Sequence, residues 1–210
     1  MHVRQYVVSA AIVALALGLS ACFKVESPPA PIQLDGQTFP ALTIAPEHMA
    51  TSDCSQVRAK RVDELDSHLR QVVDRIAFHC TMQGDMGLNT MTTAHLAPGR
   101  VEFLSIPVIE VRVSESENHW ETQYILTQDF SSAHVVLKQY LETLMQGDDC
   151  VGGPSCSLDD RYDAQGNRED GMILSLPDNY RISIYPDSDD PARTIYIRQW
   201  HDQDHDIAYQ

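Results

Sequence analysis

The stretch 129-DFSSAHVVLKQYLETLMQG-147 carries the clearest secondary-structure signal in this chain. Its apolar side chains recur every three or four residues, the spacing of one buried helix face: Leu137, Tyr140, Leu141, Leu144 and Met145. Asp129 or Ser131 is suited to cap the amino end, and Gly147 stands just past the carboxyl end. We therefore expect an amphipathic helix that buries one side against another layer of structure.

Strand-like segments surround this helix. Alternation is clearest near the carboxyl end, where Ile182 and Ile184 share one face of a strand and Ile195 and Ile197 share one face of the next. The segments expected to form strands are 101–113, 120–127, 172–176, 180–185 and 194–200, with room for one or two short strands in 32–44. Pro107 indicates an edge position or a bulge in the first of these.

Residues 62–79 show a second helical spacing, at Val62, Leu65, Leu69, Val72, Val73 and Ile76. Residues 81–100 are rich in Thr, Met, Gly and Asn, and are expected to form a long loop. The predicted fold class is α+β, a mainly antiparallel sheet covered by about two helices. Each half reads as a helix, a cysteine-bearing loop and strands, which suggests a weak internal duplication without residue-level similarity.

The amino terminus has the layout of an export signal. Arg4 precedes an apolar stretch, Val7 to Leu19, and Lys24, Glu26 and Pro28 follow within a few positions. The stretch is shorter than the roughly 20 apolar residues that a helix needs to cross a bilayer. We therefore expect a cleaved signal rather than a permanent membrane span.

Leu19-Ser20-Ala21-Cys22 resembles the lipobox of bacterial lipoproteins, residue for residue. The resemblance covers residues 1–22 and implies that Cys22 becomes a thioether to diacylglycerol, that cleavage precedes it, and that the new amino terminus is acylated. Several acyl chains on one residue anchor a protein stably, at about 0.8 kcal/mol per buried CH₂. Phe23 in place of Asp after the cysteine implies sorting to the outer membrane, with the domain facing the periplasm.

Lipidation of Cys22 leaves four cysteines, which suggests two disulfides in an oxidising compartment. Cys150 and Cys156 enclose two glycines and a proline and read as a self-closing loop, which leaves Cys54 with Cys80. A continuous helix over 62–79 would hold Cys54 and Cys80 apart. That second pairing therefore requires residues 55–62 to run back beside a shorter helix.

The chain is acidic, with a formal net charge of −15. Nucleic acid is excluded as a partner, because phosphate binding requires a basic surface. The charge suits solubility and is also compatible with steering of a basic protein partner. We expect a signal peptide at 1–21, the lipidated cysteine and a Pro-rich tether at 22–31, and one globular domain at 32–210.

Motifs for chemistry are few. The sequence lacks GxSxG, HExxH, GxxxxGK[ST] and GxGxxG. The oxygen-rich stretch 159–171 does not fit an EF-hand loop, and a solvated hairpin turn is favoured. In WHDQDHD, residues 200–206, His201 and His205 have zinc-ligand spacing if the segment is helical, although an acidic tail is the simpler interpretation. We predict no cofactor.

Three functions are compatible with these observations. The first is a membrane-anchored periplasmic protein that binds another protein, for instance as an inhibitor or immunity factor against a basic cell-wall-acting enzyme. The second is an envelope assembly or structural lipoprotein, which would show an exposed apolar patch. The third is a metal-dependent or hydrolytic enzyme, which needs a pocket with converging titratable groups. The sequence favours the first function and, on balance, argues against an enzyme.

Overall fold

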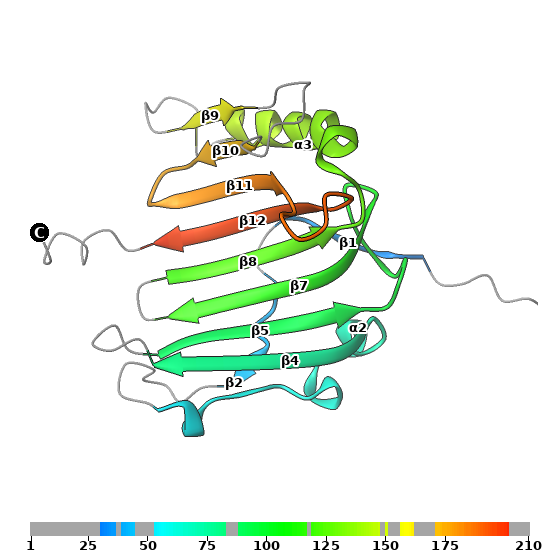
Figure 1. Ribbon diagram of the computed structural model, residues 1–210, viewed down its shortest axis with the longest axis vertical. Helices are drawn as coiled ribbons and strands as arrows, with labels where there is room; N and C mark the ends of the chain where they lie inside the picture. The colour runs from blue at the N-terminus through cyan, green and yellow to red at the C-terminus, as the bar shows by residue number, and fades with distance from the viewer. Residues whose placement is uncertain are drawn as a thin grey trace, which may run out of the picture. The chain divides into compact units, whose positions relative to one another are not determined.

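Strands dominate the part of the chain that the structure describes, and they form one large sheet and one small one (Figure 1). The computed structural model describes residues 30–36, 39–44, 53–82, 88–116, 119–147, 150, 156–161 and 171–201. The expected signal peptide and most of the expected tether lie outside these residues. Pro31–Gln210 forms one compact unit.

The large sheet has ten strands: β1 (Ile32–Leu34), β4 (Val73–Met82), β5 (Leu88–Leu96), β6 (Val101–Phe103), β7 (Ile106–Ser116), β8 (His119–Leu126), β9 (Ser157–Asp160), β10 (Met172–Ser175), β11 (Tyr180–Pro186) and β12 (Thr194–His201). The spatial order is β1-β6-β7-β8-β12-β11-β10-β9, with β5 beside the later part of β7 and β4 beyond β5. The small sheet pairs β2 (Thr43–Ile44) with β3 (Arg58–Ala59).

The large sheet is mixed, because β1 pairs with β6 in parallel while its other strand pairs are antiparallel. Two α-helices accompany it in the described residues, α2 (Ser67–Arg70) and α3 (Phe130–Met145). The chain is therefore α+β, as the sequence predicts. The helical cover is smaller than expected, since α2 has only four residues.

Helix α3 forms where the sequence places it. Of the two candidate caps, Asp129 is the residue used, and its side chain accepts a hydrogen bond from the Ser132 backbone N–H at 3.0 Å. The buried side chains of α3 recur at helical spacing: Phe130, Ala133, Leu137 and Leu141. They join the same core as the buried side chains of the sheet. Lys138 also forms an ion pair with Asp160 of β9, which ties the outer strand to the helix.

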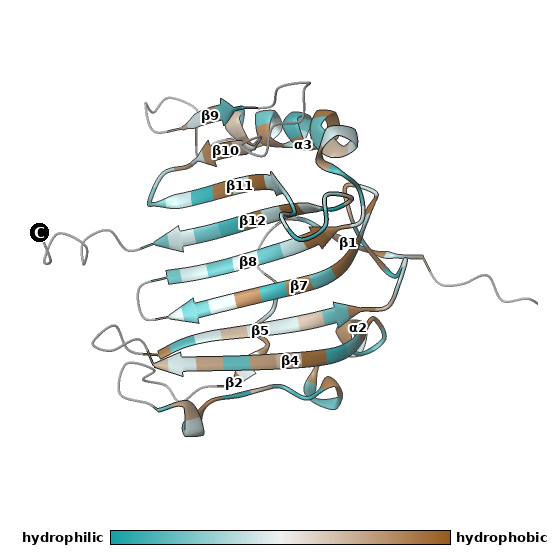
Figure 2. Ribbon diagram, viewed as in Figure 1, coloured by the Kyte–Doolittle hydropathy of each residue, from teal (hydrophilic) through white to brown (hydrophobic). Residues whose placement is uncertain are grey.

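The sheet has one face packed against this core, as the period of two along its strands requires. In β8, Thr122, Tyr124 and Leu126 are buried, and their register partners in β12 are Arg198, Tyr196 and Thr194. Figure 2 shows β7 and β8 as more hydrophobic toward Ile106 and Leu126, and more hydrophilic toward Ser116 and His119. The buried core therefore lies nearer one end of these strands.

The helix expected over 62–79 is wrong. This stretch contains a 3-10 turn at Val62–Glu64, the short helix α2, and then strand β4. In β4, Ile76, Phe78 and Cys80 alternate with more exposed neighbours, so the same apolar positions also fit a strand. The duplication loses its basis among the described residues, because the first half lacks a counterpart of α3.

The partner of β4 comes from the stretch expected to be a loop. Strand β5 lies within 81–100 and pairs with both β4 and β7. Its Thr-rich sequence, with Thr90 and Thr92 buried, suits a strand because β-branched side chains pack well on a pleated surface. Pro107 lies near the start of β7, next to a register shift between Val108 and Glu110.

Both expected disulfides are present. Cys54 and Cys80 have a Cα–Cα distance of 5.7 Å, and Cys150 and Cys156 a distance of 5.6 Å. Cys80 lies in strand β4 and Cys54 in a 3-10 turn at Cys54–Gln56, so the helix-based geometry considered for this pair does not apply. The bond attaches the segment before β3 to β4, an edge strand of the large sheet.

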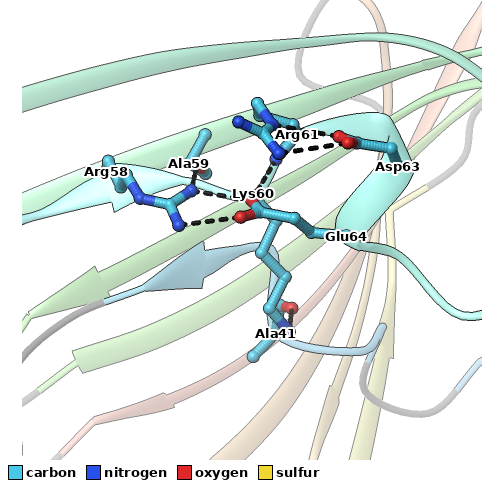
Figure 3. A network of polar contacts seen from close by, with 7 residues as sticks. All are labelled: Ala41, Arg58, Ala59, Lys60, Arg61, Asp63 and Glu64. Carbon is cyan, nitrogen blue, oxygen red and sulfur yellow. Dashed lines mark hydrogen bonds and ion pairs between the residues drawn. The ribbon is translucent and has the colours of Figure 1, made fainter.

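A network of ion pairs and hydrogen bonds shapes the segment after this disulfide (Figure 3). Arg58 donates two hydrogen bonds to Glu64, at 2.7 and 2.9 Å, and Arg61 pairs with Asp63. Lys60 donates from Nζ to the Ala41 carbonyl at 2.7 Å. The Arg58 hydrogen bonds lower the pKa of Glu64 to about 2. These contacts are local and structural, and they hold β3 beside β2.

Candidate functional site

Of the residues that the sequence singled out for lipidation or metal binding, the structure describes His201. Cys22 and His205 lie outside the described residues. His201 is the last residue of β12, so it belongs to a strand and not to the helix that zinc spacing would need. It pairs in register with His119, with ring centroids 5.8 Å apart. In the described ranges, three or more metal-ligating side chains do not gather at one point.

Two further sequence features have structural outcomes. Strands β9 and β10 pair antiparallel around the oxygen-rich stretch 159–171, although 162–170 themselves are not described. Within the described residues, helices with the length and hydrophobicity to span a bilayer are absent.

A row of aromatic side chains crosses the sheet at its more hydrophilic end. Tyr180 of β11 pairs with Trp200 of β12, Trp200 pairs with Trp120 of β8, and Trp120 pairs with Glu115 of β7. Register partners in antiparallel strands point to the same face, so these side chains are neighbours. Tyr180 is 38% exposed and the two tryptophans are partly exposed. Burial raises the pKa of the Glu115 carboxyl.

Arg198 lies on the same face, one register step further into the sheet. Its guanidinium carbon is 5.6 Å from the centroid of the Tyr180 ring, a cation–π arrangement. Its Nε atom is buried and lacks a hydrogen-bond partner, and the ion pairs of the described residues do not include Arg198. An arginine left without a carboxylate is notable in a chain with twice as many acidic as basic residues.

Thr122 stands directly opposite Arg198 in the register of β8 and β12. Its side chain is 0% exposed, and its Oγ1 atom also has no hydrogen-bond partner. Buried polar groups are normally paired, because an unmet donor or acceptor costs about 1–3 kcal/mol. Two polar groups without hydrogen-bond partners therefore lie side by side, next to the aromatic row on the same face of the sheet.

A cavity of about 450 Å³ opens at this corner of the sheet, lined by Leu176, Pro177, Asp178, Tyr180 and Arg198. Its rim is the tight turn between β10 and β11, where Asp178 and Asn179 have φ of 56° and 62°. Two left-handed residues in succession suit a two-residue hairpin turn, and Asp and Asn tolerate that conformation. The volume is in the range of small-molecule sites.

The core next to this corner contains a group of packed rings. Tyr196 donates from its hydroxyl to the Gly36 carbonyl at 2.8 Å, and Tyr140 donates to the Asp35 carbonyl at 3.1 Å. Burial raises the pKa of Tyr196 well above its ordinary value, and the neighbouring Tyr140 raises it further. Gly36 has φ of +76°, and a Cβ there would collide with the Tyr140 hydroxyl. The rings therefore anchor the chain after β1 and supply no free acid or base.

The groups that line the cavity are suited to binding a small molecule. Among the described residues, His95 contacts Glu110 and His134 contacts Asp160 between neighbouring elements, and His119 contacts Glu121 within β8. The cavity brings together a cation, a carboxylate, an aromatic ring and two apolar side chains. These groups recognise charge and shape in a bound molecule.

Sequence reasoning missed this corner for a specific reason. The alternation of Ile195 with Ile197 marks one face of β12, but the face packed on the core is the other, which carries Thr194, Tyr196, Arg198 and Trp200. The available signal was the turn Pro177-Asp178-Asn179 followed by an alternating Tyr-x-Ile-x-Ile strand. It predicts a hairpin of β10 and β11, but it cannot say which strand pairs with the other edge of β11.

Comparisons with known proteins leave the site to be judged on its own geometry. No protein family, curated protein or solved structure matches this chain.

Proposed function

We propose that this chain is a lipid-anchored protein of the bacterial envelope whose domain binds another protein. The lipobox at Leu19 to Cys22 supports the anchor, and Phe23 in place of Asp after the cysteine supports sorting to the outer membrane. The two disulfides support an oxidising compartment such as the periplasm. The proposed domain is 32–210, tethered through 22–31.

The observation that carries the binding role is the aromatic row of Tyr180, Trp200 and Trp120 with Arg198 beside it. Tyrosine, tryptophan and arginine are the residues most enriched in interface hot spots. Both tryptophans of the chain stand in this row, partly exposed, instead of in the buried core. A partner that covers the row would bury large rigid side chains at low cost in side-chain entropy.

Charge supports a basic partner. The chain carries 30 acidic and 15 basic residues, and an excess of this size steers a basic protein toward it. An inhibitor or immunity factor against a basic cell-wall-acting enzyme is the specific form of this proposal. The assembly alternative has less support, since the exposed large apolar residues of the described ranges are spread over five elements: Ile44, Met82, Met91, Val135 and Tyr180.

The binding role is tested by capture experiments with the full chain, carboxyl-terminally tagged and solubilised in detergent. Trp120→Ala and Trp200→Ala are compared with Val135→Ala, which removes a side chain of a residue 63% exposed on α3. We expect one basic protein to be retained in stoichiometric amount, released by salt, lost with either tryptophan variant, and kept with the control. Equal retention by all variants, or none by the unaltered chain, would refute the aromatic row as the interface.

The anchor is tested separately with Cys22→Ser and labelled fatty acid. We expect label in the unaltered protein only, and loss of outer-membrane fractionation in the variant. Label that persists after the substitution would refute lipidation at Cys22.

A further inference from the structure

The geometry points to a small-molecule site in the cavity at the β10–β11 turn, and we infer that its ligand is an amino acid or short peptide with a free amine and a free carboxylate. The site is the corner of the sheet lined by Leu176, Pro177, Asp178, Tyr180 and Arg198. Tyr180 and Arg198 also belong to the surface proposed for a protein partner, so a small molecule in the cavity and that partner would compete for this corner.

The cavity is lined by two opposite charges. Arg198 and Asp178 line the same space, yet they do not form an ion pair with one another, so their closest N···O distance exceeds 4.0 Å. A cation and an anion held apart across one cavity match a molecule that carries both charges. Its carboxylate would pair with the planar guanidinium, which suits bidentate recognition, and its ammonium group with Asp178.

Arg198 is oriented and available to bind an anion. Stacking on Tyr180 orients the guanidinium, and no protein carboxylate competes for it in the described residues. The Nε of Arg198 and the Oγ1 of Thr122 are both buried without a hydrogen-bond partner, so the polar environment of this arginine is incomplete. A bound anion would compensate the arginine charge in a partly buried setting, where an ion pair is stronger than on the open surface.

The remaining wall of the cavity is apolar. Leu176 and Pro177 are partly buried, and together with the Tyr180 ring they offer apolar surface between the two charges. An aliphatic or aromatic side chain on the ligand would fit against them. The expected class is therefore an amphoteric molecule with an apolar side chain, and not a simple anion.

The chain provides its own reporter for binding. Its two tryptophans, Trp120 and Trp200, both lie in the aromatic row, and Trp200 is the register partner of Tyr180. Occupation of the cavity should therefore change the intrinsic fluorescence. The probe is leucyl-phenylalanine with free termini, compared with its carboxyl-amidated and amino-acetylated forms, titrated into the full chain in detergent with calorimetry in parallel.

We expect saturable binding of the free dipeptide, weakened at least about tenfold by amidation, because hydrogen bonds to charged groups contribute strongly. Acetylation is expected to weaken binding about threefold, since Asp178 is exposed and its attraction is screened. Arg198→Gln should reproduce the loss caused by amidation. Asp178→Asn should reproduce the loss caused by acetylation, because asparagine removes the charge and still tolerates the left-handed backbone conformation of this position.

Arg181→Gln is the matched control. Arg181 lies on the neighbouring strand β11, is partly buried, and also has an unpartnered Nε, but it points to the opposite face from Tyr180 and Ile182. It should leave binding unchanged. Absence of saturable binding, equal binding of all three dipeptides, or equal effects of Arg181→Gln and Arg198→Gln would overturn the inference, whereas the capture result with the tryptophan variants would stand independently.

Discussion

The two disulfides should differ in what they contribute to stability, and their loop lengths set the size of the difference. Cys54–Cys80 closes a sequence separation of 26 residues and Cys150–Cys156 one of 6. The loss of loop-closure entropy in the unfolded chain gives about 3.5 kcal/mol for the first and about 2.2 kcal/mol for the second. The long loop should therefore contribute about 1.3 kcal/mol more to the free energy of unfolding.

The structure adds a reason for the same ordering. Cys80 lies in β4, whose only strand partner among the described residues is β5, so the first disulfide fastens the preceding segment to a weakly supported edge. Cys150–Cys156 closes a local loop after α3. Removing the first bond should therefore also loosen native contacts, which increases its cost beyond the entropy term.

The test replaces each pair by alanines, Cys54→Ala/Cys80→Ala and Cys150→Ala/Cys156→Ala, so that no free thiol remains. Equilibrium urea unfolding, followed by tryptophan fluorescence, measures the free energy of unfolding of each variant and of the parent. Full reduction of the parent should match the quadruple variant. If loss of Cys150–Cys156 costs as much as loss of Cys54–Cys80, or more, the loop-length argument is refuted for this protein.

Three further outcomes are expected. Asp129→Ala should lower the free energy of unfolding by about 1 kcal/mol, because the Ser132 N–H loses its helix cap; an unchanged urea midpoint would contradict this. Burial keeps the pKa of Tyr196 above its ordinary value of 10.0, so its contribution is complete below that pH and is lost as the pH rises. Stability measured from about pH 9 to about pH 11 should fall, and less steeply in Tyr196→Phe; parallel slopes would exclude Tyr196 as the cause. Gly171→Ala should destabilise by about 1–3 kcal/mol, because its Cβ would lie 2.5 Å from the Tyr185 ring, and a melting temperature equal to that of the parent would argue against this packing.

The comparison of α3 with the failed helix over 62–79 shows which signals are local. Helix α3 has its cap at Asp129, its apolar period and Gly147 within one continuous stretch, so neighbouring residues suffice to specify it. The apolar positions of residues 73–80 fit both the period of a helix and the period of a strand. Pairing with β5 makes this segment a strand. That pairing is invisible in either segment alone, since the hydrogen bonds of a strand are made to another part of the chain.

The cysteines illustrate the same division. The Gly- and Pro-containing loop between Cys150 and Cys156 predicted that pair from neighbouring residues, whereas the pairing of Cys54 with Cys80 followed only by elimination. How Cys54 reaches Cys80 required the path of the chain past β4.

By itself, the sequence determined the fold class, helix α3, most strands of the second half and the Cys150–Cys156 disulfide, all of which depend on local periodicity, capping and turn composition. Only the tertiary structure decided which face of β12 is buried and which side chains meet across β8, β11 and β12. Tyr180 of β11, Arg198 and Trp200 of β12, and Trp120 and Thr122 of β8 come from three strands, which become neighbours through strand register. A site assembled from cross-strand partners leaves no spacing in the sequence, because register is set by long-range packing and not by adjacent residues.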